Sequence, residues 1–269
     1  QGSLSKVDVT VAPSTAENQS LNVLTLGKYT RLLGRDIKGV NYPFVTLFSN
    51  TIYKTGSSFN FHNVTLKQGE VITLLYGITP NNNRFEIPSA NVDTSTISVT
   101  IQESSTNTYT TQYNLAQDLT EIKNTDPVFF IEENEKLTYS IYFGDNVIGK
   151  KPTTGNTVIV TYIDSVGSIA NNVTDFTFAD PVGGTFRDNV IISNVQSSYG
   201  GTDKEDIDTI RFRAPQFYTT QNRAVTVKDY ESIITKDYNN IDSVSIWGGE
   251  DNDPVVYRSE EHTSELQSH

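Results

Sequence analysis

Residues 137–143 read LTYSIYF, a run in which every second side chain, beginning with Leu137, is apolar. The same period of two occurs at 7–11 and at 97–101. Successive side chains of a strand point to opposite faces, so this alternation is typical of antiparallel sheet with one face in water. Clusters of Gly, Asn, Asp and Pro separate the runs at short intervals, as in β-sandwiches and meanders. The sequence therefore predicts a mainly β chain, with two antiparallel β units followed by a small, truncated α/β domain.

Changes in composition along the chain predict where these parts begin and end. The polar, turn-rich run at 79–84 marks the first boundary, and small residues with Gly183-Gly184 mark a stretch expected to add a strand at 190–192 to a neighbouring sheet. The expected parts are a β-sandwich-like domain (1–84), a β domain with a hairpin motif (85–167), a connector (168–199) and the truncated α/β domain (200–257).

Two helix starts follow Gly200-Gly201. Thr202 with Glu205 forms a capping box, which predicts a helix to about residue 213. Thr226 with Asp229 repeats the signal before an apolar stripe at helical spacing, and a strand is expected at 244–246. Helix, helix, strand is the beginning of a small α/β domain.

The last twelve residues, 258–269, are expected to lie outside the fold. They read RSEEHTSELQSH, which is what translation of a common short-read sequencing adapter gives, so we predict an adapter artefact. Leu266 is the one apolar side chain there and can bury too little to offset the entropy of ordering. We therefore expect no consistent contacts from this segment and an unpaired strand edge at 244–247. The absence of Met also indicates that sequence is missing before Gln1.

The composition excludes several classes of function. A formal net charge of −12 argues against nucleic acid or an anionic membrane as partner, because phosphate binding needs a cationic surface. There is no Cys, and two of the three His, His262 and His269, lie in the final segment. Only His62 could then serve a metal site or a catalytic triad, and an ordinary strand-end His is the simpler interpretation. We expect no enzymatic activity, no cofactor, no metal and no small-molecule substrate.

Two segments are more specific than ordinary β sequence. Residues 142–156 read YFGDNVIGKKPTTGN, and residues 200–215 read GGTDKEDIDTIRFRAP. The second continues into QNRAVTVKDY at 221–230. Further short motifs are SLNVLTL at 20–26, FEIP and NVD within 85–93, and a strand with Trp-Gly-Gly-Glu at 244–250.

In this order the motifs resemble the Baseplate-J-like family, and within it the inner-ring baseplate wedge subunits of T-even-type contractile-tail phages. The resemblance extends over nearly all of residues 1–257. It implies a structural subunit that forms a ring around the tail hub and takes part in the baseplate rearrangement on contraction. It also implies other wedge proteins and further copies of itself as partners, and a place in the virion after synthesis in the host cytoplasm.

Some local features have two interpretations. Asn222 and Arg223 precede a helix start and, with Tyr230, are candidates for a subunit contact; stabilisation of the local turn is the alternative. The oxygen-rich runs at 144–146 and 250–253 could hold calcium but are simpler as turn and loop, and 149–151 lacks the spacing of a phosphate loop. The alternative function is a receptor- or glycan-binding β module of a tail or adhesin protein, in which Trp247 would be the single indole platform.

Overall fold

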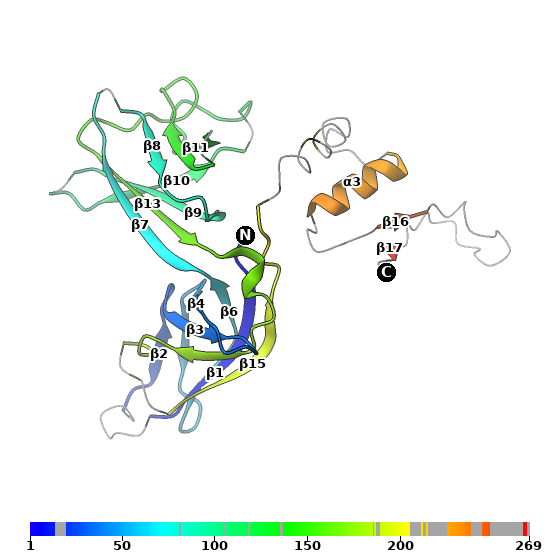
Figure 1. The fold of residues 1–269 in the computed structure, drawn as a ribbon. Helices are drawn as coiled ribbons and strands as arrows, with labels where there is room; N and C mark the ends of the chain where they lie inside the picture. The colour runs from blue at the N-terminus through cyan, green and yellow to red at the C-terminus, as the bar shows by residue number, and fades with distance from the viewer. Residues whose placement is uncertain are drawn as a thin grey trace, which may run out of the picture. The chain divides into compact units, whose positions relative to one another are not determined.

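The computed structural model is mainly β, which confirms the predicted fold class (Figure 1). It describes residues 1–13, 20–80, 82–104, 106–117, 119–134, 137–184, 186, 189–204, 211, 214, 225–237, 244–247 and 266–267. The chain divides into two compact units, Gln1–Gly201 and Thr202–His269, which we describe one at a time.

A six-stranded sheet combines the first strands of the chain with two strands that follow residue 170. Its order is β14-β3-β4-β6-β1-β15. The strands are β1 (Leu4–Val11), β3 (Arg31–Arg35), β4 (Asn41–Thr46), β6 (Phe59–Gln68), β14 (Asp175–Phe178) and β15 (Val190–Tyr199). Beside it, β2 (Val23–Leu26) and β5 (Asn50–Tyr53) form a two-stranded ribbon.

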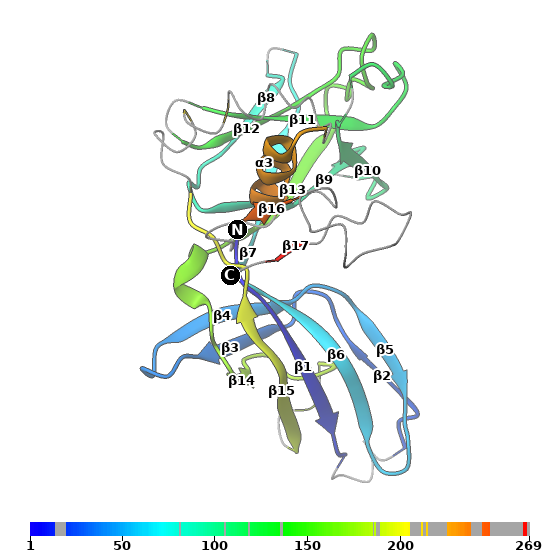
Figure 2. The ribbon, with the colours of Figure 1, turned by 90° about the vertical axis from the view of Figure 1, so that its right-hand side faces the viewer.

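The alternating pattern at 7–11 places one set of side chains inside this sheet, as predicted. Val7, Val9 and Val11 are fully buried. The sheet curves until its edge strands meet near Ser198, whose amide donates to the Val173 carbonyl at 2.9 Å. Figure 2 shows β15, β1 and β6 as neighbouring curved strands. The core residues are Val7, Val9, Val11, Leu24, Leu26, Leu32, Phe44, Phe59, Phe61, Val64, Leu66, Val173, Phe176, Val182 and Phe186.

A seven-stranded sheet follows, in the order β7-β13-β9-β10-β11-β12-β8. Its strands are β7 (Glu70–Gly77), β8 (Arg84–Ile87), β9 (Val92–Gln102), β10 (Thr110–Leu115), β11 (Val128–Glu133), β12 (Tyr139–Phe143) and β13 (Thr157–Asp164). All pairs are antiparallel except β10 with β11, which is parallel. The edge strands β7 and β8 nearly close a barrel, because the Tyr76 hydroxyl donates to the Glu86 carbonyl and the Tyr76 ring packs on Phe85.

The seven-stranded sheet is an insertion into the six-stranded one, and we call them the inserted sheet and the host sheet. Residues 70–164 supply all of it, whereas the six-stranded sheet uses residues before 69 and after 170. The chain enters along β7 and leaves along β13, and these two strands pair from Gly77↔Thr157 to Glu70↔Asp164. In Figure 1 they run side by side from the inserted sheet towards the host sheet. The insertion is therefore attached through a paired ribbon.

This topology differs from several expectations. The segment 142–156 is not a β-hairpin, because β12 and β13 are separated in the sheet by three other strands. The turn run at 79–84 joins β7 to β8 inside the inserted sheet, so β7 belongs with the strands that follow it. A local turn signal shows where the chain reverses but not which sheet each strand joins. The division at 84 and the other domain boundaries remain predictions.

Two further differences are local. Leu137 does not continue the alternation, since it has φ 60° and is 51% exposed in a turn where its amide donates to the Asn134 carbonyl. A single 3-10 turn, η1 (Gly167–Ala170), lies before the region in which helices were expected. In the stretch expected to add a strand at 190–192, β15 runs for ten residues and pairs along β1.

In the second unit, the helix expected after Thr226 is present as α3 (Val227–Asp237). Its capping is reciprocal: the Asp229 carboxylate accepts from the Thr226 amide at 2.8 Å, and the Asp229 amide donates to Thr226 Oγ1 at 3.3 Å. The helix expected from Thr202 to about residue 213 falls mostly outside the described residues. Residues 202–204 are not helical, Arg211 is, and so is Ala214, just beyond the expected end.

The expectation that 258–269 makes no consistent contacts is wrong at two residues. The expected strand, β16 (Ser245–Ile246), pairs with β17 (Leu266–Gln267), with Ile246 opposite Leu266. The physical reason is the open edge of β16 itself, since unpaired backbone groups on a strand accept almost any extended segment. The segment's one apolar residue lies in that pairing.

Candidate functional site

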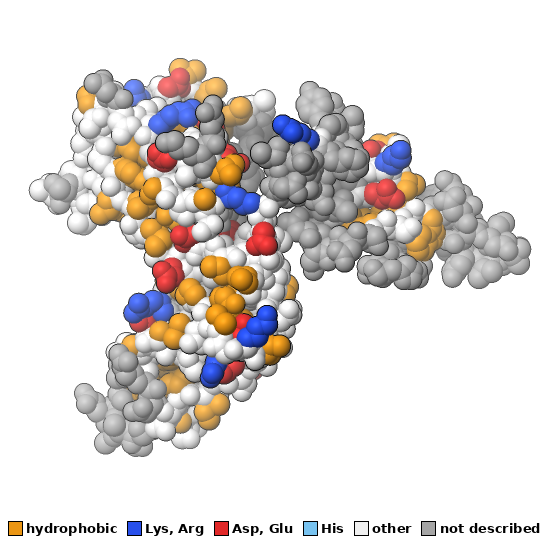
Figure 3. Space-filling view, viewed as in Figure 1, with side chains coloured by type: hydrophobic (Ala, Val, Ile, Leu, Met, Phe, Trp, Pro, Cys, Tyr) orange, Lys and Arg blue, Asp and Glu red, His pale blue; other side chains and the backbone are white. Residues whose placement is uncertain are grey.

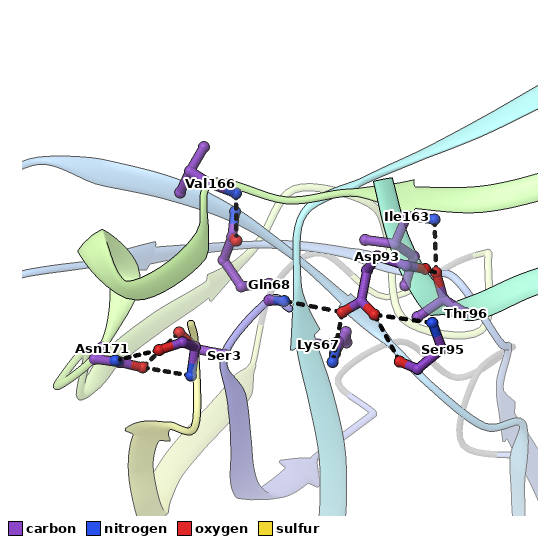
Figure 4. A network of polar contacts seen from close by, with 11 residues as sticks. Ser3, Lys67, Gln68, Asp93, Ser95, Thr96, Ile163, Val166 and Asn171 are labelled. Carbon is purple, nitrogen blue, oxygen red and sulfur yellow. Dashed lines mark hydrogen bonds and ion pairs between the residues drawn. The ribbon is translucent and has the colours of Figure 1, made fainter. Parts of the chain in front are cut away.

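Polar side chains gather where the host sheet joins the inserted sheet, and we call this cluster the junction (Figure 4). Its residues come from the start of β1, the end of β6, the start of β9, the link after β13 and the end of β15. They are Gly2, Ser3, Lys67, Gln68, Asp93, Ser95, Thr96, Val166, Asn171 and Gly201.

The centre of the junction is a buried ion pair between the two sheets. Lys67 Nζ of β6 lies 2.7 Å from Asp93 Oδ2 of β9, and the side chains are 6% and 0% exposed. The Asp93 carboxylate also accepts from the Gly2 amide at 2.9 Å and from the Ser95 hydroxyl at 2.6 Å. Burial alone would raise the pKa of Asp93, but the bonds from Lys67, Ser95 and Gly2 outweigh burial and hold the pKa below its ordinary value.

Gln68 links the strand ends beside this pair. Its backbone amide donates to the Ser3 carbonyl at 2.8 Å, and its side-chain oxygen accepts from the Val166 backbone amide at 3.0 Å. Its Nε2 is buried and has no hydrogen-bond partner among the described residues. A buried donor without a partner costs about 1–3 kcal/mol, so the junction is tightly built yet incompletely satisfied.

Asn171 holds Gly201, the last residue of the first unit, in place. Its side chain accepts from the Gly201 amide at 2.9 Å and donates to the Gly201 carbonyl at 3.0 Å, and it accepts from the Ser3 hydroxyl at 2.7 Å. A Cβ on Gly201 would lie 2.3 Å from Ser3 Oγ and 2.5 Å from the Gly167 carbonyl oxygen. Only glycine fits this close approach of three backbone segments.

The side chains of the junction can hold the two sheets in position but cannot act on a substrate. Its one cation and one carboxylate neutralise each other inside the protein, where a substrate could not reach them. A buried pair of this kind contributes little to net folding stability, but loss of one partner leaves an uncompensated charge. Such pairs favour one arrangement of the parts that they join.

The residues considered for metal or catalytic chemistry have structural partners. His62 is 71% exposed, and its Nδ1 lies 3.4 Å from one carboxylate, that of Asp8. The amide of Asn63 donates to that carboxylate and is the main cause of its lowered pKa. Within the described ranges, no group of three or more His, Asp or Glu could hold a metal ion.

The glycine-rich segment at 144–151 forms a turn, and its polar groups are used within the protein. The Asp145 carboxylate accepts from the amides of Ile148 and Val147 at 3.0 and 2.9 Å, which lowers its pKa. The Lys150 amide donates to the Asp126 carbonyl at 2.7 Å. These donors are therefore engaged rather than arranged around a phosphate.

The predicted contact residues lie in the second unit. Asn222 and Arg223 lie outside the described residues, while Tyr230 is on α3 and is 40% exposed. Trp247 follows β16 and is half-buried, and the run at 250–253 lies outside the described residues. On the face shown in Figure 3, hydrophobic side chains are spread over the described surface among uncharged polar ones. Among the described residues no helix is long and apolar enough to cross a membrane.

The junction has almost no signal in the amino-acid sequence. Lys67 and Gln68 end a long strand, and nothing in their neighbours distinguishes them from surface residues. Asp93 was the one available signal, because it ends the NVD motif at 91–93. Its partner could not be inferred, because pairing between β6 and β9 residues depends on how the two sheets are joined.

Comparison with known proteins supports a baseplate-related chain. The baseplate wedge protein gp6 of Enterobacteria phage T4 is 23% identical over 250 residues, which is 82% of this chain and 36% of that protein. The chain thus spans about a third of the relative's length. A cryo-EM structure of the anti-feeding prophage baseplate, six-fold symmetrised, matches 95% of this chain and 47% of its own at 15% identity and a TM-score of 0.32, too low to show a shared fold. No protein-family model matches the chain.

Proposed function

We propose that this chain is part of a structural subunit of a contractile-tail baseplate wedge, of the Baseplate-J-like, inner-ring kind. The observation that carries the proposal is the similarity to a baseplate wedge protein over 250 residues. In this role the protein assembles a ring around the tail hub and takes part in the rearrangement on contraction. It is made in the host cytoplasm and becomes part of the virion.

The physical character of the chain fits a scaffolding role. Buried polar side chains of the junction, among them Lys67 and Asp93, bind one another and fix backbone segments. The partners proposed are other wedge proteins and further copies of this chain, with no nucleic acid, membrane or small-molecule substrate. No catalytic activity and no cofactor are proposed.

The proposed subunit contact consists of Asn222, Arg223 and Tyr230. Tyr230 supports it, because it is partly exposed near the start of α3, and Val225 and Val227 close to it are also exposed. Tyr and Arg are the residues on which binding energy at interfaces most often depends.

Co-expression of the full-length protein with candidate baseplate proteins, followed by size-exclusion chromatography, tests the role. We expect co-elution with at least one wedge component. Tyr230→Ala should weaken that complex by roughly tenfold or more if Tyr230 is an anchor. The matched control is Tyr53→Ala, an exposed Tyr on β5, which should leave co-elution unchanged. Failure to co-elute with any baseplate protein would contradict the proposal.

A further inference from the structure

The two sheets of the first unit have separate hydrophobic cores. The buried cluster of the host sheet takes its members from residues 7–66 and 173–186, and that of the inserted sheet takes its members from 85–162. No residue belongs to both clusters. Contact between domains that is small and polar permits relative motion, whereas a large apolar contact prevents it. The orientation of the inserted sheet therefore depends on the junction.

The covalent connection between the sheets is narrow. It consists of Gly69, between β6 and β7, and the segment 165–174, which begins with Ser165 and joins β13 to β14. Gly69 has φ 133°, and a Cβ there would lie 2.3 Å from Ile163 Cγ2 and 2.5 Å from the Asp164 carbonyl oxygen. A glycine in this conformation at the root of a two-stranded ribbon is a natural bending point.

We propose that the Lys67–Asp93 pair is a latch that fixes the inserted sheet on the host sheet, and that its loss lets the inserted sheet turn about the ribbon root at Gly69 and Ser165. Each sheet keeps its own core when the latch opens, so neither unfolds. This inference rests on the geometry of Gln1–Gly201 and does not depend on the proposed function.

Buried charges suit a latch because they specify one arrangement. Apolar groups tolerate several packings, but Lys67 finds a buried counter-charge at 2.7 Å only where Asp93 lies. The same carboxylate accepts from the Gly2 amide, so the latch also holds the start of the chain. The unsatisfied Nε2 of Gln68 favours release, since turning the sheets would bring that donor to water.

Distance measurement between the two sheets tests the latch. The chain has no native Cys, so two exposed positions can carry spin labels: Ser57→Cys in the turn that leads into β6 of the host sheet, and Thr108→Cys in the loop between β9 and β10 of the inserted sheet. In the otherwise unchanged chain we expect a narrow distance distribution. In Lys67→Ala/Asp93→Ala, which leaves no buried charge behind, we expect a broader distribution with the same far-UV circular dichroism.

The control is Arg84→Ala/Glu132→Ala, which removes a pair of similar length, 2.6 Å, that is exposed and lies within the inserted sheet. It should leave the distribution narrow. Asp93→Asn is a second variant, in which Lys67 loses its partner and should turn out to water, again broadening the distribution. A narrow distribution in both latch variants would overturn the proposal, and so would loss of β structure in both. A broad distribution in either variant that remains folded supports it.

Discussion

The two sheets of the first unit are similar in size but are built differently. The inserted sheet is contiguous, so each of its strands pairs with others from residues 70–164. The host sheet brings together strands from opposite ends of the unit, and β1 pairs with β15 along its length. Sequence-distant pairing costs more chain entropy and forms more slowly. The inserted sheet therefore depends on its own core, whereas the host sheet forms only when the two chain segments that flank the insertion pair with each other.

A cavity in the core of one sheet should produce the largest difference in stability between the two sheets. Phe44 is fully buried in the host core and packs edge-on against Phe176 of β14, with ring centroids 5.1 Å apart. Phe44→Ala should destabilise the host sheet by about 3–5 kcal/mol. We expect hydrogen exchange to accelerate in β1, β4 and β15 while β9 and β13 keep their protection. Equal acceleration in both sheets would mean that they unfold as one.

A methyl group at the ribbon root should have the next largest effect. Gly69→Ala would place a Cβ against Ile163 and Asp164 at a positive φ, which we expect to cost about 1–3 kcal/mol in thermal or denaturant unfolding. Gly77→Ala is the matched control at the other end of β7, where nothing lies within 4 Å of the added Cβ. Equal stability of the two variants would show that the root of the ribbon adjusts freely.

Acid should weaken the contribution of the junction to stability, because Asp93 becomes protonated. The pKa of Asp93 is lower in the folded protein than in the unfolded chain, so its contribution to stability is complete above the ordinary carboxyl pKa of about 4. That contribution is lost as the pH falls through the folded-state pKa. We therefore expect Asp93→Asn to be less stable than the parent at neutral pH and the difference to shrink below about pH 4. Unfolding midpoints measured from pH 7 downwards give the result, and a constant difference would contradict it.

The smallest effect is expected from the end of the chain. Deleting residues 258–269 removes β17 and leaves β16 without its partner. The first unit has its own cores and sheets, so its melting temperature should not change. Differential scanning calorimetry checks this, and a clear drop in the transition of the first unit would show that the final segment stabilises it.

Local structure could be predicted from the sequence because local rules control it. Alternation at 7–11 and 97–101 identified buried faces, and Thr226 with Asp229 identified the start of α3. The partners of the strands could not be predicted, since alternation is the same whichever strand lies alongside. For this reason the segment 142–156 looked like a hairpin although β12 and β13 join different neighbours.

The site was less predictable than the fold. Asp93 lay in a motif, but Lys67, Gln68 and Asn171 carry no local sign of burial, and their roles follow from sheet contacts across many residues. Asn222 and Arg223 lie outside the described residues, so the subunit contact remains a prediction that rests on Tyr230.

The paired ribbon has a consequence for the order of folding. When β7 and β13 pair, Glu70 lies opposite Asp164, and the two ends of the insertion meet. A flexible loop of roughly a hundred residues would cost about 4 kcal/mol of closure entropy at that point. Once the insertion has folded, its two ends are held together, so the later pairing of β1 with β15 no longer carries this entropic cost. We therefore expect the middle of the chain to fold first and the host sheet to be completed only when β15 joins β1.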